Sequence, residues 1–455
     1  MTPILPLLHA AHALVGPRWE RDVRLSIDHH GVIADLDVGA SAAGCERLAG
    51  PVIPAMPNAH SHAFQRGLSG RTGHSAGDDS FWTWRTAMYD FVARLDPDAF
   101  EAIATQAYAE MAVAGYSSVA EFHYVHNDPD GNAYADPAEL AQRVVAAAAR
   151  AGIALTLLPV FYANSGFGAA APGSAQRRFI HSPEQFASMV AGLAEVAERD
   201  GFVLGIAPHS LRAVSPGALR EVLAAAPAKA PIHIHAAEQQ REVHECIAWS
   251  GERPVEWLLN HADVNARWAI VHATHATDTE RDGLIARGAT VVLAPTTEAD
   301  LGDGTFAAEH YLKNGGTMAI GSDSNTIIDP FGELRQLEYS QRLATRRRNV
   351  LARSGVPVGN ALWQSAAVGG AQACGRAAGT LAAGMRADLV VLDADEPALA
   401  GLENEGVLEA AIFGPCRTPV RDTIIGGRFV VRNGRHVQRD LILRAYRAAL
   451  ARILR

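Results

Sequence analysis

Residues 52–62 of this 455-residue chain read VIPAMPNAHSH, a short apolar run that leads directly into two histidines. Such a continuous apolar run is typical of a strand buried in a parallel sheet. The same texture, a brief apolar run followed by an alanine-rich stretch of helical period, recurs through the middle of the chain. Eight runs are found, at residues 52–56, 118–122, 154–161, 203–207, 232–236, 268–272, 290–294 and 317–321. Eight βα units predict an α/β fold built on a (β/α)8 TIM-like barrel.

The two ends of the chain differ from this middle. Short alternating stretches at residues 22–28 and 31–35, and again at 387–393 and 423–431, predict small antiparallel strands. Because chain termini often lie close together, both ends can contribute to one domain. We therefore predict a small β-sandwich domain from residues 1–52 and 376–435, the barrel from residues 53–375, and a C-terminal helix at 436–455.

Composition narrows the class of protein. Hydrophobic residues make up 48% and charged residues 20%, which excludes a disordered, coiled-coil or collagen-like chain. The net charge of −9 argues against binding to nucleic acid or to an anionic membrane, so an anionic ligand needs locally placed arginines. The four cysteines are scattered without a CxxC pair, and no apolar stretch reaches the roughly 18 residues of a membrane span. We expect a cytoplasmic location.

Histidines and carboxylates follow several of the predicted strands. His60 and His62 alternate on an extended segment, so both imidazoles can face one ion. His235 lies in the fifth run, His272 ends the sixth, and Asp323 follows the eighth. Each histidine alone is more often structural, but their joint placement at converging strand ends favours a metal site. Imidazole nitrogens with one carboxylate suit zinc and leave room for water.

With these motifs in place, the chain resembles the amidohydrolase superfamily, specifically its mononuclear-zinc deaminase branch. The resemblance implies one zinc ion, with Fe(II) or another divalent metal as alternatives, and the ligands His60, His62, His235 and Asp323. It further implies catalytic roles for Glu238 as proton shuttle, for Asp323, and for His272, which orients or polarises the reacting water and substrate.

The scarcity of lysine bears on the number of metal ions. Binuclear relatives commonly bridge two metals with a carboxylated lysine at the end of strand 4, where this chain reads APHS at residues 207–210. Its two lysines, Lys229 and Lys313, precede strands 5 and 8 instead. The sequence therefore favours a single metal.

Five motifs carry a closer resemblance, to the formimidoylglutamate deiminase family. They are MPNAHSHAFQR at residues 56–66, FWTWR at 81–85 with MY at 88–89, EFHY at 121–124, PHSLR at 208–212 and IHIHAAEQ at 232–239. This resemblance implies hydrolysis of N-formimino-L-glutamate to N-formyl-L-glutamate and ammonia in bacterial histidine degradation. The implied contacts to this small dicarboxylate are Gln65, Arg85, Tyr124, His209 and Arg212. Arginine can bind a carboxylate through two parallel hydrogen bonds.

Several alternatives stay open. A deaminase of a heterocyclic amine, such as guanine, a triazine or a thioadenosine, could use the same metal site but needs aromatic stacking and few cations. A non-catalytic barrel serving as a binding module is disfavoured because the ligand set is complete. His275 competes with His272 for the strand-6 role, and His233 is expected to be a hydrogen-bonded barrel-interior residue. The aromatic segment 81–89 is predicted to be a packed lid, and a homodimer is expected.

Overall fold

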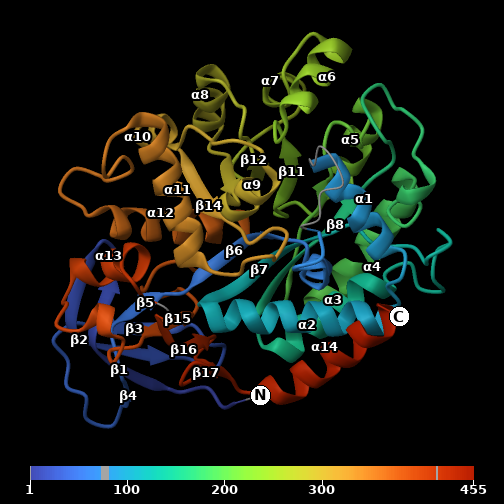
Figure 1. Ribbon diagram of the computed structural model, residues 1–455. Helices are drawn as coiled ribbons and strands as arrows, with labels where there is room; N and C mark the ends of the chain where they lie inside the picture. Colours follow the sequence, from blue (N-terminus) through green and yellow to red (C-terminus); the bar gives the residue numbers. More distant parts are fainter. Residues whose placement is uncertain (1, 73–80, 417–418, 455) are drawn as a thin grey trace.

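Two half-sheets of parallel strands form a barrel in the computed structural model, which describes residues 2–72, 81–416 and 419–454 (Figure 1). One half-sheet has the order β10-β8-β7-β6 with β9 also paired to β8, and the other has the order β11-β12-β13-β14. The strands are β6 (Met56–Ser61), β7 (Tyr116–His123), β8 (Ala154–Phe161), β9 (Val203–Leu204), β10 (Ala207–Pro208), β11 (Ile232–Ala236), β12 (Trp268–His272), β13 (Thr290–Leu293) and β14 (Thr317–Ile320).

Isolated parallel bridges close the two half-sheets into one barrel. Ile206 pairs with Ile232 and Ser210 with His235 on one side. On the other side a bridge links Ser61, at the end of β6, to Asp323, just beyond β14. The predicted α/β barrel is thus confirmed, and the C-terminal ends of all its strands face the same side, where barrel enzymes carry their active sites.

The prediction that residues 52–56 form the first barrel strand is wrong. Residues 52–54 form β5 (Val52–Pro54), which pairs with strands of the terminal sheet, and the barrel strand β6 begins only at Met56. Hydrophobicity could not separate the two, because β5 and β6 are both completely buried. The runs at 154–161, 232–236 and 268–272 coincide with β8, β11 and β12.

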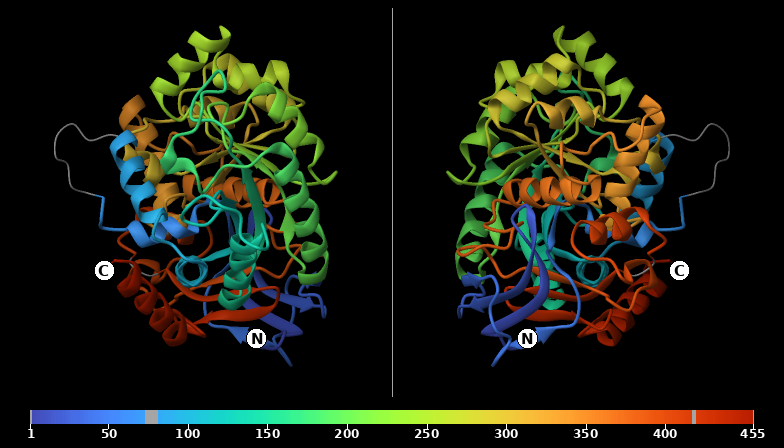
Figure 2. Two further views of the ribbon diagram at one scale, coloured as in Figure 1. Left: turned by 90° about the vertical axis from the view of Figure 1, so that its right-hand side faces the viewer. Right: turned by 90° about the vertical axis from the view of Figure 1, so that its left-hand side faces the viewer.

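Helices surround the barrel (Figures 1 and 2). Capping side chains, prolines and glycines mark where individual helices begin and end. In α2, for example, the Asp96 carboxylate caps the first turn, Pro97 occupies the first helical position, and Gly115 ends the helix at φ +102°. The helices that follow or cover the strands are α1 (Phe81–Val92), α2 (Pro97–Ala114), α3 (Glu139–Ala151), α4 (Pro183–Asp200), α5 (Pro216–Ala224), α6 (Gln240–Ser250), α7 (Pro254–His261), α8 (Asp278–Arg287), α9 (Pro295–Leu301), α10 (Ala308–Lys313), α11 (Pro330–Thr345), α12 (Val358–Ala373) and α13 (Glu405–Phe413).

The barrel interior is filled by small side chains beneath the strand ends. Along β12, Ala269 and Val271 alternate with Trp268 and Ile270, which belong to the main core between strands and helices. Alternating residues point to opposite faces, so the first pair faces inward. The inner cluster comprises Ala59, Ala269, Val271, Val292, Ala319 and Ala373. This floor supports the strand ends from below.

Both ends of the chain contribute to one β-domain, as predicted, and this domain lies at one end of the molecule below the barrel (Figure 2). Its strands form a mixed sheet, because β1 pairs in parallel with β4 and β5. Its order is β18-β17-β16-β15-β5-β1-β2-β3, with β4 paired to β1. Its strands are β1 (Leu7–Val15), β2 (Arg18–Ile27), β3 (Ile33–Asp37), β4 (Glu46–Leu48), β5, β15 (Leu389–Leu392), β16 (Val420–Ile425), β17 (Arg428–Arg432) and β18 (Arg435–His436). Residues of both ends, including Leu8, Val23, Leu389 and Ile424, share a separate hydrophobic core.

The C-terminal helix α14 (Arg439–Ile453) packs against α2, with Ile442, Ala449 and Ile453 buried. It begins at 439 rather than 436 because His436 still pairs with Val431 in the terminal sheet. None of the helices in the described residues combines the length and the apolar composition that a membrane span requires.

Candidate active site

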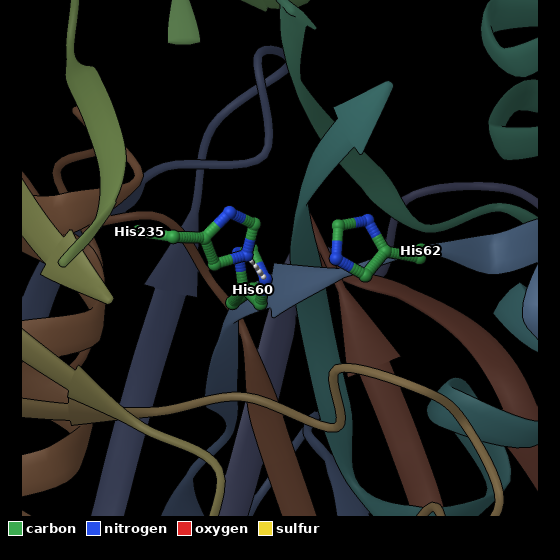
Figure 3. Close-up of side chains that lie close together, drawn as sticks. All are labelled: His60, His62 and His235. Carbon is green, nitrogen blue, oxygen red and sulfur yellow. Dashed lines mark hydrogen bonds between the residues drawn. The ribbon is translucent and has the colours of Figure 1, made fainter. Parts of the chain in front are cut away.

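Three histidines converge at the C-terminal ends of β6 and β11 (Figure 3). His60 lies within β6, His62 follows it by one residue, and His235 is the fourth residue of β11. One ring nitrogen of each lies within 4.8 Å of the others, and the Nε2 atoms of His60 and His235 are 3.1 Å apart. The structure therefore brings together the three imidazoles that the motifs singled out.

Hydrogen bonds to backbone carbonyls orient two of these rings. The Nδ1–H of His62 donates to the carbonyl of Phe122 and that of His235 to the carbonyl of His209, both at 3.1 Å. A carbonyl only accepts, so Nε2 of each ring carries the lone pair. Burial lowers the pKa of His60 to about 3, so its imidazole is neutral. The Nε2 lone pairs of His62 and His235 thus lie close to Nε2 of His60, and three ring nitrogens gathered in this way fit a metal ion.

Asp323 places a carboxylate beside the histidines. Its Oδ1 lies 3.4 Å from Nε2 of His60 and 3.3 Å from Nε2 of His62. The residue is buried and has a φ of +44°, a left-handed conformation that turns the chain sharply beyond β14. Imidazole nitrogens and a carboxylate oxygen are the donor types found in catalytic zinc sites, where a water completes the coordination.

His272 stands between the carboxylates of the site. Its Nε2 is 3.8 Å from Oε1 of Glu238 and 3.8 Å from Oδ2 of Asp323, while its Nδ1 is 3.2 Å from Oε1 of Glu298. Burial lowers the pKa of His272, but the surrounding carboxylates outweigh it and raise the pKa to about 10. His272 and Ala273 have φ of +67° and +49°, and such strain in residues other than glycine clusters at functional sites.

Glu238 and Arg212 form the other side of the site. Burial raises the pKa of the Glu238 carboxyl, although His272 and Arg212 act in the opposite direction. Arg212 is only 7% exposed, and its Nη2 lies 3.7 Å from Oε2 of Glu238. Its Nε–H is buried without a hydrogen-bond partner among the described residues. A buried guanidinium with an unused donor, aimed toward a cavity, fits an anionic ligand.

A cavity opens above the candidate metal site. Its walls include nearly all the predicted site residues: His62, Gln65, Arg85, Tyr124, His209, Arg212, His235, Glu238, His272 and Asp323. His60 lies fully buried below them. Gln65 donates through its amide to the hydroxyl of Tyr124 at 2.9 Å. The cavity thus joins the metal site to cations and hydrogen-bonding side chains.

Helix α1 covers the cavity with an aromatic wall. Five of its residues, Phe81, Trp84, Arg85, Met88 and Tyr89, line the cavity. The Arg85 guanidinium lies 4.6 Å from the centre of the Trp82 ring, and that of Arg241 from α6 lies 4.4 Å from the same ring. The contact from Arg241 therefore links α1 to α6, whereas Arg85 and Trp82 both lie on α1. Nothing in the sequence pattern had pointed to Arg241.

Two further histidines, His233 and His275, lie outside the candidate metal site. His233 lies in the barrel interior and its Nε2 is 2.8 Å from the carbonyl of Ala373, as expected for a structural residue. His275 is hydrogen-bonded to Gln240. Among the described residues, His272 lines the cavity and His275 does not. Glu298 was missed at the sequence level. The available signal was a carboxylate five residues after β13.

Comparisons with known proteins agree with this geometry. The model of the amidohydrolase family matches residues 52–430, and that described as formimidoylglutamate deiminase HutF, N-terminal domain, matches residues 6–50. The chain is 48% identical to a formimidoylglutamate deiminase of Pseudomonas aeruginosa, covering 98% of this chain and 99% of that protein.

Solved structures show the same fold. The crystal structure of an amidohydrolase from Brucella melitensis superposes with a TM-score of 0.94 at 46% identity, covering 99% of this chain and 100% of the other. An adenosine deaminase from Xanthomonas campestris with bound zinc has a TM-score of 0.81 at 23% identity over 100% and 99% of the two chains, which shows the fold alone.

Proposed function

Because this chain belongs to the amidohydrolase family, we propose that it hydrolyses N-formimino-L-glutamate to N-formyl-L-glutamate and ammonia. Three observations support this substrate. They are the five sequence motifs between residues 56 and 239, the match of residues 6–50 to the N-terminal domain of formimidoylglutamate deiminase, and the 48% identity to such an enzyme. The single observation that carries the proposal is structural. One cavity has His62, His235 and the Asp323 carboxylate at its floor, with His60 buried directly below them, and the buried Arg212 on its wall.

We propose that the cofactor is one zinc ion, with Fe(II) as the alternative, held by His60, His62, His235 and Asp323. When bound, zinc lowers the pKa of water from 15.7 to about 7 and so supplies a nucleophile at neutral pH. The Nδ1–H bonds of His62 and His235 to backbone carbonyls support this ligand set, because they direct both Nε2 lone pairs to one place. In the described part of the chain, the lysine that would bridge a second metal is absent from residues 207–210, at the end of β10.

Glu238 is the proposed proton shuttle. Its carboxylate accepts a proton from water as the water oxygen attacks the formimino carbon, and returns that proton to the terminal nitrogen. Glu238 then carries the remaining hydroxyl proton of the tetrahedral adduct to the same nitrogen, the bond from carbon to this nitrogen breaks, and ammonia leaves while the carbon keeps the oxygen as a formyl group. Nε2 of His272 lies 3.8 Å from carboxylate oxygens of both Glu238 and Asp323. It donates a hydrogen bond to the attacking water oxygen, which gains negative charge as Glu238 takes its proton. Such proton transfer typically contributes about 10²–10⁴-fold in rate.

The two substrate carboxylates are proposed to bind Arg212 and Arg85. Arg212 is buried beside the reacting groups, and Arg85 is held against Trp82 on the covering helix. Gln65, Tyr124 and His209 complete the contacts from the cavity wall. These local cations overcome the repulsion expected from the net charge of −9. They also distinguish this pocket from one suited to an uncharged heterocycle.

Substrate-dependent ammonia release tests this assignment. Zinc-loaded protein is expected to release one ammonia per N-formimino-L-glutamate consumed. Guanine, a triazine and a thioadenosine serve as comparison substrates at equal concentration. If one of these is hydrolysed while formiminoglutamate is left intact, the proposed substrate is wrong.

Metal removal is expected to abolish activity reversibly. Dialysis against a chelator removes the ion, and one equivalent of zinc then restores turnover. His235→Ala is expected to remain folded but to purify with far less metal, since it loses a ligand. Elemental analysis and circular dichroism measure both properties. His244→Ala, an exposed histidine on α6, is the control and should keep the wild-type metal content. Full activity after chelation would contradict the proposed cofactor.

Glu298 is expected to hold His272 in its working orientation. Removing a hydrogen-bonding partner behind an active-site histidine typically costs 10–100-fold, so Glu298→Ala is expected to lower kcat by about this factor with little change in KM. Glu298→Gln keeps an amide oxygen that accepts the Nδ1–H and should recover part of the loss. Steady-state kinetics measure the split between kcat and KM. Equal activity of wild type and both variants would leave Glu298 without this role.

We also propose that the protein is a cytoplasmic homodimer. The scattered cysteines without a CxxC pair support a reducing compartment. Light scattering on the purified protein and fractionation of cells test the two statements separately.

A further inference from the structure

A buried asparagine joins the two segments that carry the metal-site residues. Asn325 is fully buried in the turn after β14. Its Nδ2 donates toward the Ser61 Oγ at 3.1 Å and the carbonyl of His62 at 3.0 Å. It also contacts the carbonyl of Asp323 at 3.0 Å. A single amide group therefore touches the backbone of one histidine and of the carboxylate residue, which are 261 positions apart in the chain (323 − 62).

The other end of the Asn325 amide continues the same network. Its Oδ1 accepts a hydrogen bond from the Ser322 Oγ at 2.7 Å, and that Oγ accepts from Nδ2 of Asn58 at 2.7 Å. Oδ1 of Asn58 accepts from the backbone N–H of Ser322 at 3.1 Å and of His60 at 3.4 Å. We refer to Asn58, Ser61, Ser322 and Asn325 as the Asn325 clasp. All four side chains are fully buried.

The barrel needs such a connection at this point. β6 and β14 are not joined by a regular ladder but by the isolated bridge between Ser61 and Asp323. Two backbone hydrogen bonds accompany it, from the N–H of His62 to the carbonyl of Asp323 and from the N–H of Asp323 to the carbonyl of His60. Few main-chain contacts therefore fix Asp323 relative to the histidines, and the clasp adds side-chain contacts from both segments.

The turn itself adopts a conformation that depends on its residue types. Asp323 has a φ of +44° and Asn325 a φ of +56°, both in the left-handed region. Asparagine enters this region more easily than most residues, and its side chain here bonds to the surrounding backbone. The conformation aims the Asp323 carboxylate back at His60 and His62.

We infer that Asn325 is a positioning residue of the metal site, which holds Asp323 in register with His60 and His62 and thereby sets the affinity for the divalent ion. The inference rests on the proposed function only in taking zinc as that ion. Residues that orient metal ligands from behind typically contribute 10–100-fold in affinity. In this role Asn325 acts on metal binding through Asp323, and it contacts neither the reacting water nor the substrate.

Zinc affinity of Asn325→Gly tests this role. Glycine reaches a φ of +56° without steric cost, so the substitution removes the clasp while the backbone conformation remains accessible. Competition with a chromophoric chelator is expected to show zinc binding 10–100-fold weaker than in the wild type. Asn433→Gly is the matched control, an exposed asparagine at a φ of +50° in the turn between β17 and β18, and should bind zinc within about twofold of the wild type.

Ser322→Ala provides a second variant that keeps Asn325 but removes the link to Asn58, and a smaller loss of zinc affinity is expected. Thermal unfolding of the metal-free proteins is measured alongside. If Asn325→Gly unfolds at a lower temperature yet binds zinc as the wild type does, the asparagine is only a structural residue and the inference is overturned. Wild-type protein that binds zinc but does not hydrolyse formiminoglutamate would reject the proposed substrate, while the affinity ratio would still decide the role of Asn325.

Discussion

Glu238→Gln is expected to lower kcat by about 10²–10⁴-fold while the protein keeps its full complement of metal. Glutamine has nearly the same shape as glutamate, so it preserves the packing around a side chain that is only 5% exposed. It cannot accept a proton from water or return one to the leaving nitrogen. The loss therefore falls on the chemical step, and KM is expected to change much less than kcat.

Matched measurements separate this role from general damage to the site. Glu245→Gln, the same substitution at a partly exposed position on α6, should leave kcat unchanged. Asp323→Ala, by contrast, should lower metal content and turnover together, because this carboxylate lies within 3.4 Å of two histidine nitrogens. A Glu238→Gln enzyme with near-normal kcat would remove Glu238 from the proton-transfer steps.

Arg212→Met is expected to weaken substrate capture strongly with the metal site intact. Removing one partner of a buried charge pair costs about 2–5 kcal/mol, on the order of 30- to 5,000-fold in kcat/KM. Methionine fills part of the volume but offers no hydrogen bonds to a carboxylate. Arg212→Lys keeps the charge and loses the paired hydrogen bonds, so an intermediate kcat/KM is expected.

The control for this substitution is Arg220→Met, an exposed arginine at the same flank of the barrel on α5, which should behave as the wild type. Zinc content of all variants is measured by elemental analysis, and kcat/KM by ammonia release. An unchanged kcat/KM for Arg212→Met would show that another side chain, such as Arg85, holds the carboxylate near the reacting atoms.

Much of the barrel follows from local pattern. The apolar runs coincide with β8, β11 and β12 because these strands are buried on both faces and therefore carry continuous apolar residues. The helix α2 follows from an Asp-Pro start and a glycine end. The first barrel strand could not be placed in the same way. The chain crosses from the terminal sheet to the barrel within residues 52–61, and β5 and β6 are equally buried.

The residues of the candidate metal site could be named from the sequence, because side chains able to bind a metal stand there directly at the ends of predicted strands. Imidazoles and a carboxylate follow apolar runs, and parallel strands in a barrel end on the same side. The roles given to these residues stay proposals until the variants are measured. Glu298 offered one such signal, a carboxylate after β13, but its partner His272 is 26 positions away. Arg241 and Asn325 could not be named in that way, since each acts through a partner distant in the chain. Asn325, for example, is 263 positions from His62.

By itself, then, the sequence determined the barrel with its terminal sheet, the family resemblance and the chemical types gathered at the strand ends. These depend on periodicity and on residues within a few positions of one another. The tertiary structure alone decided which sheet receives β5, that Arg241 and Arg85 share the ring of Trp82, and that Asn325 ties Asp323 to His62. The physical reason is that hydrogen bonds and ring contacts act over a few ångströms in space, and only closure of the barrel brings such distant residues within that range.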